Sequence, residues 1–251
     1  MSLTVGRIGA AAVLTLDDGA RRNVLRLEMC RAISAAVAAA NADPGVKAIV
    51  ITGAGPAFCA GADLDDLKAA AGGATDALDA VYQSFIDVAD SALPTISAIN
   101  GAAIGAGVNL ALACDIRIAS TAAHFDTRFL KIGLHPGGGH GWLLLRAVGW
   151  AEASRLLLFG HTVAAGEAAA IGLVQQVAEP DAMMDAVNVL TARTEALPRD
   201  LIIRTKASLR HAAAATHAEA FAHETAEQLR SLGEPPFRDL VARLQASIKA
   251  R

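Results

Sequence analysis

Apolar residues along the first two thirds of the chain form short runs that alternate with longer amphipathic stretches. The β-rich alternating run GAAAVLTLD predicts a strand over 9–17, and KAIVITG predicts a short buried strand over 47–53. Residues 28–45 have the spacing of an amphipathic helix that ends at the Asp-Pro-Gly turn. The same pattern predicts strands over 95–101, 116–120 and 123–126 and helices over about 64–71 and 108–114. This alternation predicts an α/β domain with helices packed on a sheet.

The pattern changes at about Asp181, after which every long segment has helical periodicity. The predicted helical segments cover 182–197, 201–232 and 237–250, and prolines separate them. We therefore divide the chain into an α/β region, 1–180, and a helical region, 181–251. Because these helices cannot form a compact core alone, we expect them to pack on their own domain or on neighbouring subunits.

Composition narrows the classes of protein that the chain fits. Its 251 residues suit one large domain, or one domain with an appendage, and its net charge of -3 without a basic stripe argues against a nucleic-acid partner. Mean hydropathy is +0.39, yet no stretch gives about 20 apolar residues without a charge or a turn signal, so we expect no membrane partner. The start of the chain does not resemble a signal peptide, and the three cysteines lack a CxxC pair, which favours reduced thiols and a cytoplasmic location.

Two glycine-rich stretches share the order strand, small-residue turn, helix. Neither GAGPAF (53–58) nor GAAIGAG (101–107) fits a phosphate-binding loop, because Phe58 takes the last glycine position of the first and no Gly-Lys-Ser/Thr follows either. The first turn of a helix leaves backbone N–H groups unpaired at its electropositive end. Two such groups that converge on one point would make an oxyanion hole, which small residues would let a carbonyl group approach closely.

Five segments together resemble the enoyl-CoA hydratase/isomerase (crotonase) superfamily, in the right order and over nearly the whole chain. They are TLDDGARRNVLRLEM, ITGAGPAFCAGADL, AINGAAIGAGVNLALACDIRIAS, FDTRFLKIGLHPGGG and LLLFGHTVAAGEAAAIGLVQQV. The resemblance implies an α/β fold, a crotonase-type ββα spiral core with a helical C-terminal trimerisation region, assembled as a homotrimer or a dimer of trimers. It also implies an acyl-CoA thioester as ligand, stabilisation of a thioester enolate, and no separate cofactor, since coenzyme A is part of the substrate.

The resemblance also assigns residues to the site. The oxyanion N–H groups would come from Ala60 and Ala106, and Arg22 would contact a CoA phosphate unless it is an ordinary solvated surface arginine. Phe129 and Leu130 would line the acyl pocket. The loops 20–24 and 60–64 would bind CoA through Arg22, Val24, Ala60, Ala62, Asp63 and Leu64.

The carboxylates of the superfamily are missing from this chain. The two glutamate positions of the hydratases fall on Asn109 and Phe129, and a third position, where some relatives carry Asp, falls on Gly137. A positioned general acid or base contributes about 10²–10⁴-fold. An amide at 109 would still orient a water or a substrate oxygen by hydrogen bonding. Hydration by the two-glutamate mechanism is therefore not expected.

Other residues are candidates for proton transfer, each with a plainer alternative. His135 would carry protons, or would only satisfy backbone groups in its glycine-rich turn. Asp126 would do the same, or would cap a strand end and pair with Arg128. His140 is expected at the surface or packed, and no metal is expected because His135 and His140 lack a third ligand. Cys59 is interpreted as a packing residue rather than a nucleophile.

Two functions follow from these patterns. The first is an acyl-CoA enzyme of the hydratase/isomerase kind, a lyase or isomerase of fatty acid metabolism, with Asn109, His135 and Asp126 near the reaction. The alternative is a catalytically silent acyl-CoA-binding protein that keeps the oxyanion hole but has lost the proton-transfer groups.

Overall fold

The chain forms two compact units that divide after Glu195, and the computed structural model describes residues 3–249. The predicted boundary after residue 180 differs from this division because α7, Met183–Glu195, packs on the sheet of the first unit. Its Met183 and Val187 are buried in one cluster with Val13, Val50 and neighbouring sheet residues.

The first unit is built on two sheets that successive turns of the chain share. The larger sheet has the order β1-β2-β3-β5-β7-β10, with β1 antiparallel to β2 and the remaining neighbours parallel. Its strands are Leu3–Ile8, Ala11–Leu16, Ala48–Gly53, Thr95–Ile99, Ile116–Ser120 and Gln176–Ala178. The smaller sheet has the order β4-β6-β8-β9, with strands Ala57–Cys59, Ala102–Ile104, His124–Asp126 and Val163–Ala164.

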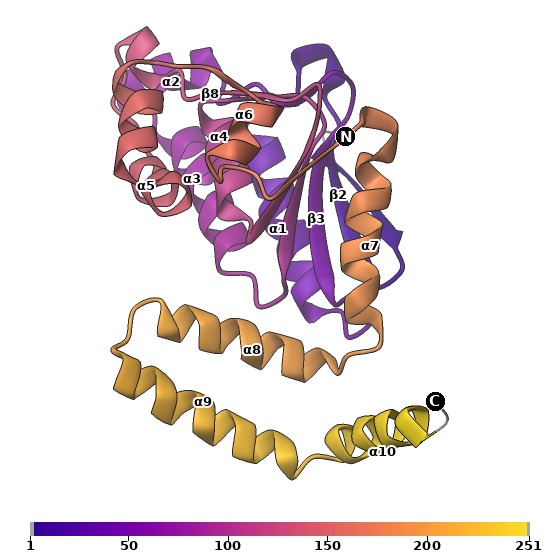
Figure 1. The fold of residues 1–251 in the computed structure, drawn as a ribbon. Helices are drawn as coiled ribbons and strands as arrows, with labels where there is room; N and C mark the ends of the chain where they lie inside the picture. Colours follow the sequence, from indigo (N-terminus) through magenta and orange to yellow (C-terminus); the bar gives the residue numbers. More distant parts are fainter. Residues whose placement is uncertain (1–2, 250–251) are drawn as a thin grey trace. The chain divides into compact units, whose positions relative to one another are not determined.

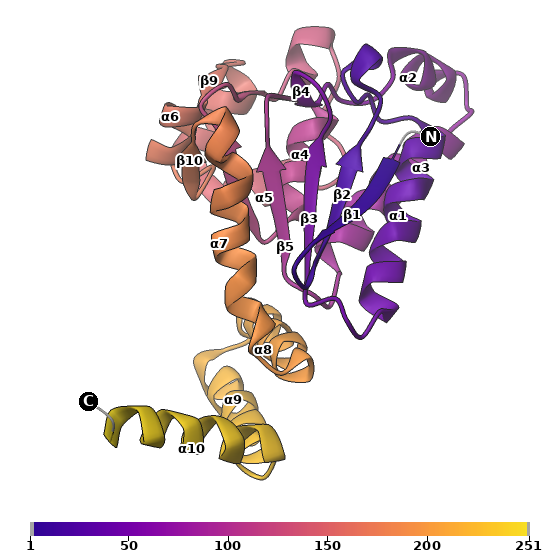
Figure 2. The same ribbon diagram turned by 90° about the vertical axis from the view of Figure 1, so that its right-hand side faces the viewer.

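After the first hairpin, three successive turns of the chain each give one strand to the larger sheet, the next strand to the smaller sheet, and then a helix. This order, β3-β4-α2, β5-β6-α4 and β7-β8-α5, confirms the expected ββα spiral. Figures 1 and 2 show α7 on one face of the larger sheet and α1 and α3 on the opposite face. The remaining helices of the first unit are α1 Leu27–Ala42, α2 Leu64–Ala71, α3 Asp76–Ala89, α4 Ala106–Ala113, α5 His140–Leu158 and α6 Ala165–Ala170. Short 3₁₀ turns are η1 Gly19–Arg21, η2 Phe129–Ile132 and η3 Pro180–Ala182.

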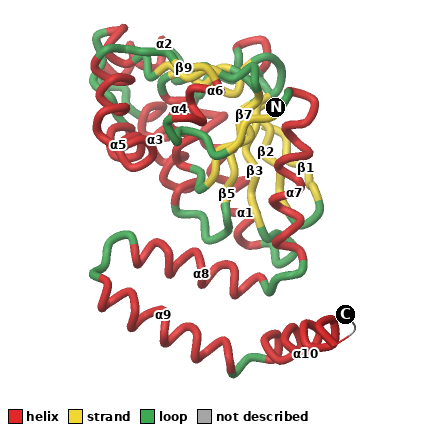
Figure 3. The backbone as a smooth tube through the Cα atoms, in the orientation of Figure 1, coloured by secondary structure: helices red, strands yellow, loops and turns green. Residues whose placement is uncertain are grey.

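The second unit consists of helices and short connections over its described residues (Figure 3). Its helices are α8 Arg199–Ala212, α9 His217–Leu232 and α10 Pro235–Lys249, so residue 250 of the last predicted helix lies outside the described part. The predicted helix over 201–232 is broken, because Thr216 starts α9 with a capping box that includes Glu219.

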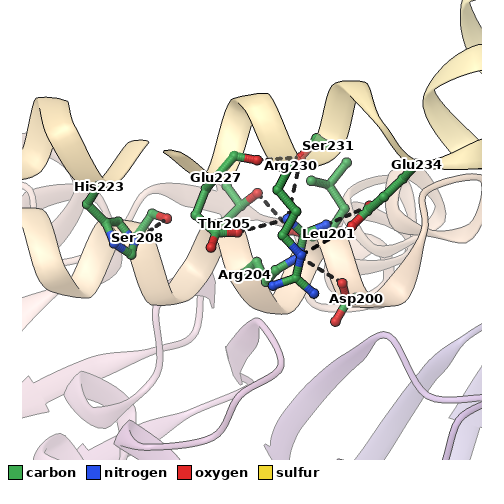
Figure 4. Close-up of polar contacts among 10 residues, drawn as sticks. All are labelled: Asp200, Leu201, Arg204, Thr205, Ser208, His223, Glu227, Arg230, Ser231 and Glu234. Atoms are coloured by element: carbon green, nitrogen blue, oxygen red, sulfur yellow. Dashed lines mark hydrogen bonds and ion pairs between the residues drawn. The ribbon is translucent and has the colours of Figure 1, made fainter. Parts of the chain in front are cut away.

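An ionic network centred on Arg204 joins the helices of the second unit (Figure 4). The guanidinium of Arg204, whose side chain is 11% exposed, lies 2.7 Å from Asp200 on its own helix and 2.8 Å from Glu227 on α9. It also lies 2.8 Å from Glu234, just before α10. One planar, always charged group with several donors can satisfy all three carboxylates, so α8 and α9 are fixed against each other. No helix among residues 3–249 is long and apolar enough to cross a membrane.

Candidate active site

A cavity of about 440 Å³ opens in the first unit, where the loop before α2 meets α3, the start of α4 and the η2 turn. Most of the predicted site residues line it: Val24, Ala60, Ala62, Asp63, Leu64, Ala106, Asn109, Phe129 and His135. The predicted site residues Arg22, Asp126 and Leu130 do not line it. Leu130 is 45% exposed at the surface, so its assignment to the acyl pocket is not supported, whereas Phe129 is buried against the cavity. The exposed side chain of Arg22 leaves its phosphate contact a prediction.

A buried asparagine that the sequence analysis missed fixes the loop beside the cavity. Asn23 has a left-handed backbone, φ 58°, and no exposed surface. Its amide Nδ2 donates to the carbonyls of Ala54 at 2.9 Å and Ala57 at 2.8 Å, and its Oδ1 accepts from the Asp18 N–H at 2.9 Å. Asparagine suits this position because it tolerates the left-handed region and supplies both a donor and an acceptor. The side chain thus ties the loop 20–24 to the loop that carries Ala60.

The backbone N–H of Ala60 is not free, which corrects its assignment to the oxyanion hole. It donates to the carbonyl of Arg22 at 2.9 Å. Further along the same pairing, Leu25 donates to Gly61 at 2.8 Å and Asp63 donates to Leu25 at 3.2 Å. The N–H of Ala62 lies between these two bonds and donates to no acceptor within the described part of the chain. The free donor of this loop is therefore Ala62, two residues beyond the one predicted.

The second predicted donor, Ala106, has the free N–H expected of it. Ala106 is the first residue of α4, and its N–H has no acceptor among residues 3–249. The loop with Ala62 passes close to it, since a Cβ added at Gly61 would lie 2.8 Å from the Ile104 carbonyl oxygen and 3.7 Å from the Ala106 nitrogen. Gly61, at φ +101°, is the residue type that permits this approach. Two residues with unpaired N–H groups, one of them at a helix N-terminus, thus line the same cavity.

The side chain of Asn109, one turn further along α4, uses its polar atoms in hydrogen bonds within the protein. Its Nδ2 donates to the carbonyls of Gly137 at 2.9 Å and Gly138 at 3.2 Å, and its Oδ1 lies 2.5 Å from Nδ1 of His140. The two carbonyls can only accept, so both amide hydrogens are used and the oxygen is the atom facing the histidine. The expectation that this amide orients a water or a substrate oxygen is therefore not supported.

His140 is buried beside Asn109 and Phe129, so of the two predicted places, surface or packed, the packed one is observed. Since Oδ1 of Asn109 is an acceptor, Nδ1 of His140 carries the proton, and Nε2 is buried with no partner in the described structure. Burial lowers the pKa of His140 to about 4. The ring meets Phe129 edge to face, with 4.8 Å between the ring centres. His140, Asn109 and Phe129 together form a neutral, closely packed group at the cavity.

Asp126 pairs with two cationic side chains and accepts a backbone hydrogen bond at the start of the η2 turn. Its carboxylate lies 2.9 Å from Arg128 and 3.1 Å from Lys131, and it accepts from the backbone N–H of Arg128 at 2.9 Å. Burial raises the pKa of this carboxyl, but the hydrogen bonds from Arg128 and Lys131 outweigh it and hold the pKa below its ordinary value. The alternative of a strand-end cap paired with Arg128 is the one that the contacts support.

Two further side chains line the cavity, and Cys59 lies outside its lining. His135 lines the cavity with an exposed side chain whose Nδ1 lies 2.8 Å from the carbonyl oxygen of Pro136. Tyr82 of α3, which the sequence analysis missed, also lines it. Cys59 is fully buried, and burial raises its pKa to about 12, in keeping with a packing residue. Among the described residues, no group of three or more metal-binding side chains occurs.

Comparisons with known proteins agree with this architecture. The enoyl-CoA hydratase/isomerase family model matches residues 7–232. A probable enoyl-CoA hydratase of Mycobacterium tuberculosis is 45% identical over 243 residues, which cover 94% of this chain and 93% of that protein. The crystal structure of an enoyl-CoA hydratase from a Polaromonas species has a TM-score of 0.91 at 29% identity, covering 98% of this chain and 97% of that chain. A putative enoyl-CoA hydratase/isomerase from Mycobacterium abscessus has a TM-score of 0.89 at 31% identity, covering 98% and 96%. This chain belongs to the enoyl-CoA hydratase/isomerase family.

Proposed function

We propose that the cavity binds an acyl-CoA thioester and that the N–H groups of Ala62 and Ala106 donate hydrogen bonds to its carbonyl oxygen. The observation that carries the proposal is that these two N–H groups are unpaired and belong to residues that line one cavity. Donors fixed in advance by the backbone stabilise the negative charge of an enolate without reorganising during the reaction. Such donors stabilise a reaction most when negative charge develops on the oxygen that they contact. The site therefore favours chemistry through a thioester enolate.

The reaction is not two-glutamate hydration. Asp63 is the one carboxylate among the described residues that line the cavity, and it caps α2 and pairs with Arg26 at 2.8 Å. The side chain of Asn109 is occupied, and Phe129 cannot transfer a proton. His135 is the histidine that reaches the cavity, and we assign proton transfer to it. Isomerisation, C–C cleavage and thioester hydrolysis all fit an oxyanion hole combined with one base.

A catalytically silent acyl-CoA-binding protein is the second candidate. The closed group of Asn109, His140 and Phe129 favours it, because this group is neutral and has no spare donor directed at a ligand. Both functions need the two free N–H groups and differ in whether any thioester is turned over.

Calorimetry and turnover assays together test the proposal. We expect acyl-CoA to bind more tightly than free coenzyme A, because the free thiol has no carbonyl for the two N–H groups. We also expect His135→Ala to reduce turnover of the acyl-CoA substrates by about 10²-fold or more, the effect of losing a general base. The matched control is His124→Ala, which removes an exposed histidine outside the cavity.

Each outcome of these assays decides one part of the proposal. Equal affinity for acyl-CoA and free coenzyme A would contradict the binding site itself. Tight binding without turnover of crotonyl-CoA, 3-enoyl-CoA or other thioesters would leave the silent binding protein as the function. Turnover that is unaffected by His135→Ala would remove His135 as the proton carrier.

A further inference from the structure

Tyr82, the single tyrosine of the chain, places a hydroxyl group on an otherwise apolar wall of the cavity. It belongs to α3, whose other residues along the cavity are Leu78, Val81 and Phe85. These positions lie three or four residues apart, so they share one face of the helix. The hydroxyl is thus the polar atom that this face offers to a ligand.

The hydroxyl is packed against the turn at 137–138. A Cβ added at Gly137 would collide with the Tyr82 hydroxyl oxygen and lie 3.2 Å from Cζ. A Cβ at Gly138, φ +61°, would lie 2.9 Å from Cδ1 of the same ring and 3.1 Å from Cδ2 of Phe85. Both glycines therefore make room for the tyrosine ring. The Tyr82 hydroxyl occupies the space that a side chain at 137 would need.

The protein supplies no hydrogen-bond partner for this hydroxyl in its described part. The neighbouring carbonyls of Gly137 and Gly138 accept from Asn109 instead. Burial raises the pKa of Tyr82, so the group stays a neutral O–H donor at neutral pH. Tyr82 is half-buried and its hydroxyl has no partner within the described protein, so the partner comes from what occupies the cavity, water or a bound ligand.

We propose that Tyr82 is a specificity-determining residue that selects acyl groups carrying a neutral oxygen, a hydroxyl or a keto group, over plain hydrocarbon chains. This inference rests on the proposed binding of an acyl-CoA thioester. Ala106 and Asn109 are three residues apart on α4, a rise of about 4.5 Å, and Asn109 holds the turn that Tyr82 touches. The oxygen therefore lies on the acyl chain, beyond the thioester carbonyl.

A hydrocarbon chain in this cavity would displace water from the Tyr82 hydroxyl without replacing its hydrogen bond. A site built around a hydrogen-bonding group rejects analogues that lack the matching group, because its own polar atom is left unpaired. An acyl oxygen at the right carbon supplies that partner. Discrimination is therefore expected in binding itself, whether or not the ligand is turned over.

The test is a calorimetric comparison of hexanoyl-CoA with hexanoyl-CoA hydroxylated at carbon 3, 4, 5 or 6. We expect at least one hydroxylated isomer to bind the wild-type protein about tenfold or more tightly than hexanoyl-CoA. Tyr82→Phe keeps the ring and removes only the hydroxyl, so it should abolish the preference while leaving the affinity for hexanoyl-CoA unchanged or improved. Gln83→Ala, at an exposed neighbour outside the cavity, should keep the preference.

The results separate this inference from the proposed function. If hexanoyl-CoA and every hydroxylated isomer bind equally, or if the preference survives Tyr82→Phe, the role of Tyr82 is refuted while acyl-CoA binding stands. If none of these thioesters binds more tightly than free coenzyme A, the proposed function fails and this inference fails with it. Circular dichroism of Tyr82→Phe checks that the variant is folded.

Discussion

Acidification should destabilise the first unit through His140. In the unfolded chain a histidine titrates near pH 6.5, whereas burial lowers the pKa of His140 to about 4 in the folded protein. Between these values the unfolded state binds one more proton than the folded state, so the free energy of unfolding falls as the pH falls. The buried Nε2 has no acceptor within the described structure, so its protonation would leave a charged N–H unpaired.

The size of the effect follows from the two pKa values. A difference of 2.5 pH units at about 1.4 kcal/mol each gives a loss of about 3 kcal/mol once the pH has fallen well below 4. Between pH 7 and pH 4.5 the loss is about 2 kcal/mol. Typical free energies of unfolding are only about 5–15 kcal/mol, so the change is readily measured.

Urea unfolding at pH 7 and pH 4.5 measures this contribution. Both tryptophans, Trp142 and Trp150, lie in α5 with His140, so their fluorescence reports on the unit of interest. In His140→Asn the amide can still donate to Asn109 but does not titrate. This variant should be less stable at pH 7 and should lose about 2 kcal/mol less than wild type on acidification. The same pH dependence in wild type and His140→Asn would refute the reasoning, and the exposed His124→Asn should behave as wild type.

Three further outcomes are expected. Asn23→Ala should lower the free energy of unfolding by about 3 kcal/mol, because the buried carbonyls of Ala54 and Ala57 lose their donor. The neighbouring Arg22→Ala should change it by less than about 0.5 kcal/mol, and equal effects of the two variants in urea unfolding would contradict this. A thiol reagent at pH 8 should label the cysteines of the folded protein slowly, since all three are buried and burial raises the pKa values of Cys30 and Cys59 to about 12. All three should react rapidly in denaturant, and rapid labelling of the folded protein would contradict the prediction. Light scattering should give a multiple of three times 25.7 kDa, because α8, α9 and α10 expose apolar side chains such as Leu209, Phe221 and Leu244, and a monomer mass would contradict the trimer.

The sequence predicted the longer elements of the fold well. Apolar runs and their end signals placed β3 and α2 within a residue of their observed bounds. The three-residue strands β4 and β6 were missed, because such short strands in glycine-rich turns have too few residues to show a period. Helix α7 was assigned to the wrong region, since periodicity shows that a helix has an apolar face but not what covers it.

The site was predicted to the level of its loops but not its atoms. The motif located the loop 60–64, yet only the backbone pairing with Leu25 shows that Ala62, and not Ala60, keeps a free N–H. His140 was undervalued and Tyr82 was missed for a similar reason. His140 contacts Asn109, which is 31 residues away along the chain. Tyr82 contacts Gly137, which is likewise distant in sequence, so both contacts form only in the folded protein.

The central claim is that backbone donors polarise a thioester carbonyl, and the infrared carbonyl band of a bound, ¹³C=O-labelled acyl-CoA tests it most directly. Ala106→Pro removes one donor at the first position of α4, where a helix tolerates proline, and Ala106→Gly keeps the N–H as the control. The band should move to lower frequency on binding to wild type and to Ala106→Gly, and should move back in Ala106→Pro. A band at the same frequency for the acyl-CoA bound to wild type and to Ala106→Pro would contradict the account.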